Sequence, residues 1–393
     1  MDEAVNPYAP GAGTPPPVMT GRDDLVAIAR VALVRAKAGR SAKSFVAVGL
    51  RGVGKTVVLN RILDLAEAEG FQTIQIEADE DKPLVELLIP QIKRVLFRLD
   101  RIDGAQEVVR RGLRVLKSFV SSAKLKYGEF EAGLDLNAEQ GSADSGDLAT
   151  DLPDLMLAVG EAAKAKSTAV AIFIDEVQYL TEAELRSLIG GLHRINQRQL
   201  PIVLIAAGLP QVIARMGEAK SYAERLLSFP RVDALGEPEA RAALVEPARA
   251  ADVEFDEEAV SEIVRVTRGY PYFLQEWGYV IWNTAAHTPI TIADVAAAAF
   301  ETRRRLDQSF FRVRIDRMTP SEKRYIRAMA SLGEGPHRSG DIALQYGAKV
   351  STVAPVRSSL ISKGMIYSPA HGDTAFTVPL FDDFIRREMP GPD

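Results

Sequence analysis

The chain has 393 residues, a net charge of −5 at pH 7 and no cysteine, so it can have neither disulfide bonds nor thiolate metal sites. Its composition, 47% hydrophobic and 26% charged, is typical of globular proteins, and no apolar run approaches the roughly 20 residues that cross a bilayer. The length predicts two or three compact units and the apolar pattern excludes a membrane span.

Residues 1–20 are rich in proline and glycine. They lack the basic start and the apolar middle of a signal peptide, so we expect a cytoplasmic protein. The segment predicts an exposed N-terminal arm that precedes the first folded unit.

The stretch GLRGVGKT, residues 49–56, has the spacing of a phosphate-binding loop, G-x-x-x-x-G-K-[ST]. An apolar run precedes it and a helical pattern follows, which is the strand–loop–helix order that such a loop requires. Its glycines allow backbone N–H groups to turn towards phosphate oxygens, and the next helix adds its positive dipole end. We expect Lys55 to neutralise the phosphates of ATP and Thr56 to bind Mg²⁺. The residues predicted to contact the nucleotide here are Gly49, Gly52, Val53, Gly54, Lys55, Thr56 and Val57.

An insertion is predicted at about residues 120–155. Residues 123–136 alternate apolar and polar side chains, which indicates a hairpin. The acidic residues 137–151 predict a solvated, mobile loop, and an interaction element of the ATPase face is the alternative.

An acidic pair follows a second apolar run. Residues 169–174 are continuously apolar, as expected of a parallel strand buried on both faces, and Asp175 and Glu176 stand at its end. We expect Asp175 to bind the Mg²⁺ of the nucleotide and Glu176 to polarise the attacking water. Thr181 and Glu184 form a capping box, which predicts that a helix begins there. Together the two motifs predict an ATP-hydrolysing α/β core of the P-loop NTPase class.

With these motifs the chain resembles the AAA+ superfamily, in the branch shared by archaeal origin-recognition initiators and STAND ATPases. The hexapeptide TGRDDL, with Gly21 and Arg22, is similar to the element that lies by the adenine and ribose in that branch. The resemblance covers most of the chain. It implies an ATPase core over residues 21–233, ATP and Mg²⁺ as ligands, and self-association or a protein partner.

The resemblance also implies four positions near the nucleotide, two of which depart from the usual pattern. Gly208 follows a predicted strand at 201–207, where these ATPases usually have a polar sensor residue. Arg225 matches an arginine finger, with an ordinary surface arginine as the alternative. Pro271 looks like the G-x-P element of STAND proteins, or simply starts a helix, and Tyr272 stands where initiators have a sensor arginine. The missing sensors predict slow, assembly-dependent hydrolysis.

The last third of the chain has a different pattern. Residues 234–311 contain several helical patterns, and the resemblance implies a helical lid. Residues 312–393 predict three short helices and a hairpin, the order of a winged helix, whose third helix enters the major groove when it reads DNA. The candidate DNA contacts on that helix are Ser351, Thr352, Arg357, Ser358 and Lys363. Arg303 to Arg305 either line a phosphate backbone or form a solvated helix face.

The sequence therefore predicts an ATP-dependent switch that acts on duplex DNA, similar to initiator or transposition-type ATPases. The alternative is a STAND-like signalling or defence ATPase whose winged helix binds a protein. A metabolic kinase is a weaker interpretation because no segment resembles a small-molecule acceptor site. Salt-sensitive binding to duplex DNA separates the first two interpretations.

Overall fold

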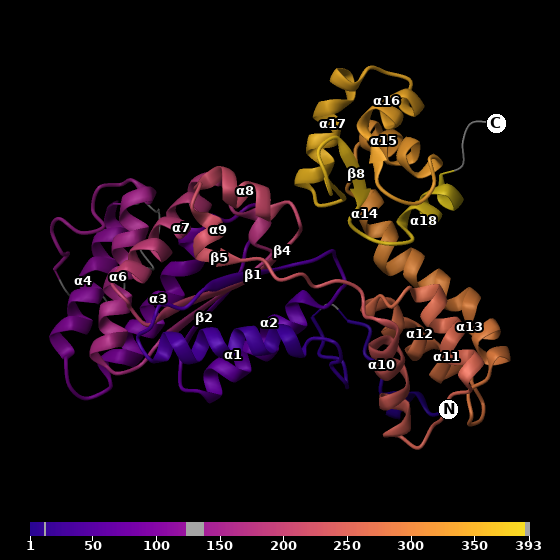
Figure 1. Ribbon diagram of the computed structural model, residues 1–393, viewed down its shortest axis with the longest axis horizontal. Coiled ribbons are helices and arrows are strands. Elements are labelled where there is room, and N and C mark those ends of the chain that lie inside the picture. The colour runs from indigo at the N-terminus through magenta and orange to yellow at the C-terminus, as the bar shows by residue number, and fades with distance from the viewer. Residues whose placement is uncertain (12, 123–136, 390–393) are drawn as a thin grey trace. The chain divides into compact units, whose positions relative to one another are not determined.

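The computed structural model describes residues 1–11, 13–122 and 137–389, which form two compact units (Figure 1). The core unit comprises Arg22–Gly49 and Lys55–Arg231, and the C-terminal unit comprises Met1–Gly21, Leu50–Gly54 and Val232–Asp393. In the part of the chain that is described, no helix is long and apolar enough to cross a membrane.

A five-stranded parallel sheet forms the centre of the core unit. Its order is β2-β3-β4-β1-β5, and every residue of β1, β3 and β4 is buried because helices cover both faces. The strands predicted from continuous apolar runs are therefore confirmed. The bounds are β1 Ser44–Val48, β2 Gln72–Glu77, β3 Val170–Asp175, β4 Ile202–Gly208 and β5 Leu227–Ser228.

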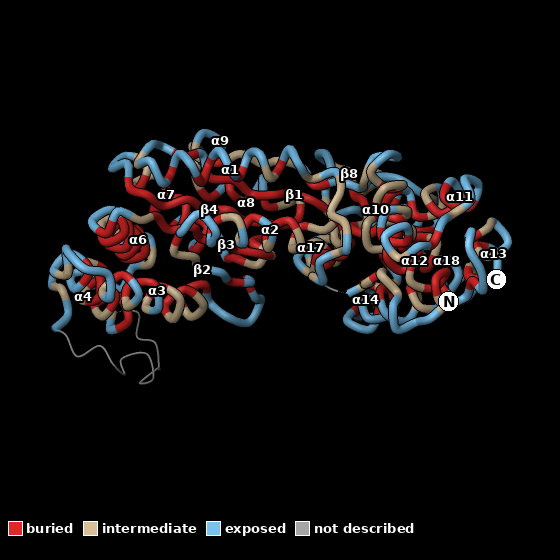
Figure 2. Tube along the Cα trace, turned by 90° about the horizontal axis from the view of Figure 1, so that it is seen from below, coloured by how far each residue is buried: buried red, intermediate tan, exposed pale blue. Residues whose placement is uncertain are grey.

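The helices of the core unit lie in two layers (Figure 1). α1 and α2 pack on each other and against β4. The chain reverses its direction across the sheet after β2, and right-handed crossovers then place α3 and α7 on the opposite face. α6 packs between α4 and α7 and is buried along most of its length (Figure 2). The bounds are α1 Asp23–Lys37, α2 Lys55–Ala68, α3 Leu84–Asp100, α4 Gln106–Ser122, α6 Leu148–Ala165, α7 Glu182–Gln197, α8 Val212–Ala219 and α9 Ala223–Leu226.

The predicted capping box at the start of α7 is confirmed and has a second role. Glu184 accepts the Thr181 backbone N–H at 2.8 Å, and the Thr181 hydroxyl accepts the Glu184 N–H. The other carboxylate oxygen of Glu184 accepts the Leu84 N–H at 2.5 Å, at the first residue of α3. One buried carboxylate therefore satisfies the ends of two helices.

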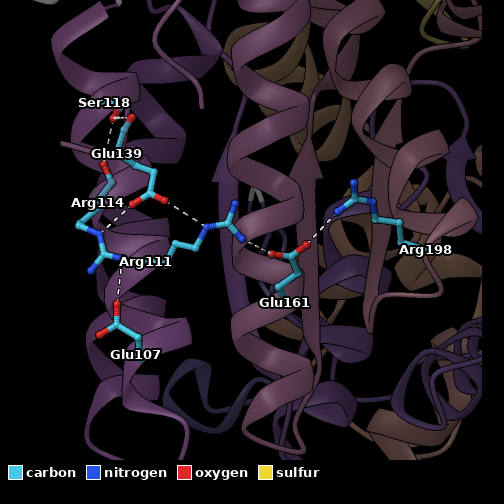
Figure 3. Close-up of polar contacts among 7 residues, drawn as sticks. All are labelled: Glu107, Arg111, Arg114, Ser118, Glu139, Glu161 and Arg198. Carbon is cyan, nitrogen blue, oxygen red and sulfur yellow. Dashed lines mark hydrogen bonds and ion pairs between the residues drawn. The ribbon is translucent and has the colours of Figure 1, made fainter. Parts of the chain in front are cut away.

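The segment 137–151 is mostly exposed, as expected of a solvated loop, and several of its residues are held by polar contacts. Glu139 accepts hydrogen bonds from Arg114 at 2.8 Å and Arg111 at 3.3 Å, and its carbonyl accepts from Ser118 at 2.7 Å (Figure 3). Arg111 also pairs with Glu161 of α6, which pairs with Arg198 (Figure 3). These partners lie far from the segment in sequence, so composition could not reveal them.

Asp151 completes this arrangement at the start of α6. Its buried carboxylate accepts from the backbone N–H groups of Ser145 and Gly146, at 3.1 and 2.8 Å, and from the Ser145 hydroxyl. Buried polar groups of this kind are normally paired, and here the acid satisfies a turn that would otherwise lack acceptors. The hairpin predicted for residues 123–136 lies outside the described residues.

A helical bundle makes up the first part of the C-terminal unit, and its apolar core includes Leu244, Ile263 and Trp282. Its helices are α10 Glu237–Arg249, α11 Glu257–Thr267, α12 Pro271–Thr284 and α13 Ile292–Arg305, followed by the π-helix η3 Leu306–Phe311 and by α14 Arg312–Asp316.

The N-terminal residues pack onto this bundle, so the expectation of an exposed arm is wrong for its first part. The short helix η1 (Glu3–Val5) precedes Tyr8, which is 3% exposed and donates its hydroxyl to the Leu244 carbonyl. The Tyr8 ring occupies the space where a side chain at Gly278 would lie. A large aromatic ring facing a helical glycine explains why this proline-rich segment is fixed.

The elements from α15 to α18 are called the C-terminal domain below. They include the three helices and the hairpin predicted from the sequence, and add a strand and a closing helix. Its antiparallel sheet has the order β6-β8-β7. The bounds are α15 Pro320–Ser331, β6 His337–Arg338, α16 Ser339–Tyr346, α17 Val350–Ser362, β7 Ile366–Tyr367, β8 Asp373–Phe376 and α18 Phe381–Glu388.

A buried carboxylate ties α15 to α17. Glu322 is 3% exposed and accepts from Lys363 Nζ at 2.8 Å, from the Thr319 N–H at 2.7 Å and from the Ser359 hydroxyl at 2.7 Å. Burial acts to raise the pKa of Glu322, but these hydrogen bonds and the Lys363 charge outweigh it and lower the pKa to about 2.

We predict that Glu322→Gln destabilises the C-terminal domain in a pH-dependent manner. The folded-state pKa lies below that of an unfolded glutamate, so the ionised group stabilises the domain above about pH 5 by about 2–3 kcal/mol, and this is lost towards pH 2. Urea unfolding of both proteins between pH 7 and pH 3 measures it. The stability gap should shrink as the pH falls, and an equal gap at both ends would contradict the prediction.

Candidate functional site

The carboxyl ends of β1, β3 and β4 meet at one edge of the core sheet. Gly49 follows β1, Asp175 ends β3 and Gly208 ends β4. The Gly49 N–H donates to the Gly208 carbonyl at 3.1 Å, so these ends are adjacent. In open α/β sheets this edge is where ligands bind.

Two predicted magnesium ligands lie in direct contact at this edge. The Thr56 hydroxyl, in the first turn of α2, donates to Asp175 Oδ2 at 2.6 Å. Burial raises the pKa of Asp175, while the hydrogen bond from Thr56 and the nearby Lys55 charge act in the opposite direction. Lys55 is itself 6% exposed, at the first residue of α2.

This pair fits a magnesium ion that arrives with a nucleotide. Hydroxyl and carboxylate oxygens are the ligands that Mg²⁺ prefers, and it is commonly held by one or two side chains together with substrate phosphates. Within residues 1–11, 13–122 and 137–389, no three histidine or acidic side chains form a metal cluster. The phosphates would therefore have to supply further ligands.

Sequence reasoning missed a third acid at the same edge. Glu77 is the last residue of β2 and pairs in register with Asp175. Burial and the negative charges of Asp175, Glu176 and Asp79 raise the pKa of Glu77. Its only sequence signal was an acid at the end of a half-buried strand, which is too common to be noticed alone.

Glu176 lies in a turn with an unusual backbone. Its φ is 50°, in the left-handed region that non-glycine residues rarely adopt, and it begins the short helix η2 (Val177–Tyr179). Its N–H donates to Asp175 Oδ1 at 2.8 Å, and its Oε2 accepts from the Gln178 side-chain amide. The predicted magnesium ligand and the predicted water-polarising acid are thus held by one turn.

The glycine at the end of β4 is required by its surroundings. A Cβ on Gly208 would lie 2.8 Å from Val177 Cγ1 and 3.0 Å from Gln178 Oε1. The polar side chain expected at this position would have to displace the side chains of Val177 and Gln178. Gln178 occupies the neighbouring space, and its Oε1 accepts the Leu209 N–H at 3.0 Å.

Residues Leu50–Gly54 belong to the same compact unit as α12. Gly52 and Gly54 have φ angles of 81° and 90°, which the loop could not adopt readily with other residues. Within this unit the Tyr272 N–H donates to the Gly52 carbonyl at 3.3 Å, and the Tyr270 hydroxyl donates to the Arg51 carbonyl. Pro271 lies between these two tyrosines, at the first position of α12.

The other predicted nucleotide residues occupy varied positions. Gly21 has a φ of 64° and Arg22 caps the start of α1. Val53 is buried and Val57 is half-buried in α2. Arg225 is exposed on α9, two residues before β5.

The structure separates the candidate DNA contacts into two groups. Ser351, Thr352 and Ser358 are exposed on α17. Arg357 instead donates to the Thr374 hydroxyl at 2.8 Å and to the Asp373 carbonyl at 2.9 Å, and Lys363 pairs with Glu322. Both basic side chains are therefore used within the domain.

Comparisons with known proteins agree with this geometry. Residues 18–205 match the family described as AAA ATPase domain. This segment is similar to that family and contains GLRGVGKT and the acidic pair, and the chain is a nucleotide-binding ATPase, as those two motifs predicted. Residues 308–385 match a family described as Domain of unknown function (DUF8462), and no curated protein matches the chain.

One solved structure shows the same fold at low sequence identity, and two others have lower TM-scores. A Walker-type ATPase of Pyrococcus abyssi has a TM-score of 0.59 and 16% identity, over 94% of this chain and 96% of that one. Cdc6p from Pyrobaculum aerophilum has a TM-score of 0.49 and 13% identity, over 99% of both chains. Aeropyrum pernix Orc1, solved in complex with DNA, has a TM-score of 0.43 and 15% identity, over 95% of this chain and 94% of that one. The first of these likenesses shows the fold alone.

We predict that Lys55→Ala weakens ATP binding by about 10–100-fold, because it removes a charge-assisted contact to phosphate. Glu176→Gln should bind ATP normally and lose turnover by about 10²–10⁴-fold, as expected of a group that acts on the attacking water. Equilibrium nucleotide binding and phosphate release measure the two effects. Unchanged affinity in Lys55→Ala would remove this lysine from the phosphate site.

Proposed function

We propose that the chain is an ATP-driven switch, slow as a single copy and faster in an assembly, which reports its nucleotide state through the C-terminal domain. In this account Lys55 binds the phosphates, and Thr56 and Asp175 hold Mg²⁺. The ion, when bound, neutralises charge on the β- and γ-phosphates. Glu176 orients a water molecule for attack on the γ-phosphorus and accepts its proton.

The exposure of Arg225 supports hydrolysis that depends on assembly. Its side chain is exposed on a four-residue helix, and none of the residues that the structure describes forms an ion pair with it. An exposed, unpaired arginine next to a core strand is suited to reach the γ-phosphate of a neighbouring copy. The need for such a group follows from the resemblance, since Gly208 supplies no polar sensor and Tyr272 no sensor arginine.

We predict that Arg225→Ala binds ATP normally but hydrolyses it about 10³–10⁵-fold more slowly, the range known for arginine fingers. Specific activity of the native protein should rise with its concentration. Mixing Arg225→Ala with Lys55→Ala is the direct experiment, because a mixed assembly can pair an intact loop with an intact arginine. Recovery of activity is expected. Its absence, with co-assembly demonstrated, would mean that Arg225 acts in its own copy or only structurally.

For the partner of the C-terminal domain, a protein fits the geometry better than duplex DNA. Arg357 and Lys363 are engaged inside the domain. Two large apolar side chains are exposed in this domain: Leu344 of α16 is 81% exposed, and Val350, the first residue of α17, is 48% exposed. Exposed apolar residues beside small polar ones are typical of a protein-binding surface. This is the STAND-like signalling or defence function predicted as the alternative.

The arginines between residues 303 and 317, before the C-terminal domain, also favour a protein partner. Much of their charge is neutralised locally, which reduces their attraction for phosphates. The pairs are Arg304 with Glu301, Arg305 with Glu276, and Arg312 with Glu388, and Arg314 lies over the Phe310 ring at 4.0 Å. Burial lowers the pKa of Arg314 to about 10.

Duplex DNA is the second candidate, as in an initiator-like or transposition-type ATPase with a winged helix. The observation that favours it is the exposure of Ser351, Thr352 and Ser358 along α17, with Lys349 exposed just before it. Hydroxyls and a lysine at the start of a recognition helix suit phosphate and base-edge contacts.

A binding experiment with the full chain separates the two partners. We predict that any affinity for duplex DNA at low salt is weak and is unchanged by Ser351→Glu with Ser358→Glu, because α17 does not enter the groove. Fluorescence anisotropy at increasing salt measures it, with Glu254→Gln in the helical bundle as a control surface variant. Tight binding that falls steeply with salt, and that the double substitution weakens, would establish DNA as the partner instead.

A further inference from the structure

The turn after β3 places a buried glutamine between Glu176 and the end of β4. Gln178 is 4% exposed, and its side-chain amide makes one hydrogen bond at each end. Its Oε1 accepts the Leu209 N–H at 3.0 Å, and its Nε2 donates to Glu176 Oε2. We propose that Gln178 is a positioning residue for ATP hydrolysis, which fixes the Glu176 carboxylate from the space that Gly208 leaves open. This inference rests on the role proposed for Glu176.

The orientation of this amide is determined by its partners. The Leu209 N–H can only donate, so the oxygen of Gln178 must face it and the NH₂ group must face Glu176. A donor at Oε2 restricts rotation of the carboxylate and leaves Oε1 of Glu176 to receive the proton of the attacking water. Holding a catalytic group in one orientation is a large part of what positions water for reaction.

The backbone of Gln178 is fixed as firmly as its side chain. Arg215 of α8 donates to the Gln178 carbonyl and, at 2.6 Å, to the Leu180 carbonyl. Arg215 is half-buried, and this burial lowers its pKa. The turn from Glu176 to Leu180 is therefore held by a side chain of α8 and by the backbone at the end of β4. Glu176 keeps its left-handed conformation because the surrounding contacts specify it.

Gly208, which has no side chain, belongs to the same arrangement as Glu176 and Gln178. A Cβ at residue 208 would lie 2.8 Å from Val177 Cγ1 and 3.0 Å from Gln178 Oε1, so a polar residue at the end of β4 would have to push the amide of Gln178 out of its present position. The chain has the amide, and it comes from η2, which directly follows the strand that carries Asp175. The polar side chain missing at residue 208 is then replaced by the amide of Gln178, whose N–H donor is directed at Glu176.

The test compares variants that separate the two hydrogen bonds. Gln178→Met keeps the length of the side chain and removes both bonds, whereas Gln178→Glu retains an acceptor for Leu209 and removes the donor to Glu176. Gln72→Met is the matched control, because Gln72 lies at the opposite, amino end of the sheet and its Oε1 has no partner among the described residues. Turnover, ATP affinity and thermal unfolding are measured for each.

We expect both substitutions at residue 178 to lower kcat by about 10–100-fold, since small misplacements at a reacting group can cost this much. ATP affinity should stay within about twofold, and Gln72→Met should leave kcat unchanged. In single-turnover measurements, Gln178→Met should add no further loss in the Glu176→Gln background, because both changes remove the same step.

Three results would overturn the proposal: a normal kcat in Gln178→Met, losses that multiply in the double variant, or parallel losses of stability and ATP affinity that account for the loss of kcat. These results are distinct from failure of the proposed function. If Glu176→Gln itself retains turnover, the role of Glu176 is wrong and the role of Gln178 falls with it. If Glu176→Gln loses turnover but the Gln178 variants remain active, Glu176 keeps its proposed role and Gln178 does not position it.

Discussion

A hydrogen bond of 2.6 Å joins the Thr56 hydroxyl to the Asp175 carboxylate, across 119 residues of sequence. It exists because the carboxyl ends of parallel strands lie at one edge of the sheet, where the loop after β1 and the acid ending β3 become neighbours. The other features of the site depend on this contact. Glu77 adds negative charge beside Asp175, and Lys55 adds the positive charge that partly compensates for it.

In the proposed function, the backbone after β3 makes this edge, where phosphate and Mg²⁺ would bind, a site for attack by water. Asp175 accepts the N–H of Glu176, and the left-handed turn brings Gln178 back towards Glu176. Gly208 is part of this arrangement, because a Cβ at this position would lie only 2.8 Å from Val177 and 3.0 Å from Gln178. In the proposed function, a lone copy has Glu176 held in place and Lys55 at the phosphates, but no second cationic group for the charge that develops on the γ-phosphate. The exposed Arg225 has the chemistry to supply it.

The parts that sequence predicted correctly are those that depend on local pattern. Continuous apolar runs identify strands buried on both faces, and glycine spacing identifies the loop before α2, so the α/β core and Asp175 could be found without a structure. Side-chain direction could not be predicted. Arg357 and Lys363 looked like DNA contacts, but one donates to β8 and the other to Glu322. The contacts of Glu139 and Tyr8 could not be predicted because their partners, Arg114 and Gly278, are distant in sequence.

The central claim is that Asp175 and Thr56 hold Mg²⁺ only together with a nucleotide. Equilibrium binding of ATP to the native chain and to Asp175→Asn, each with Mg²⁺ and with EDTA, tests it most directly. We expect Mg²⁺ to tighten binding in the native chain by about 10-fold or more, and Asp175→Asn to lose that gain while its affinity in EDTA stays the same or improves. An Asp175→Asn protein that keeps the full effect of Mg²⁺ would contradict the account.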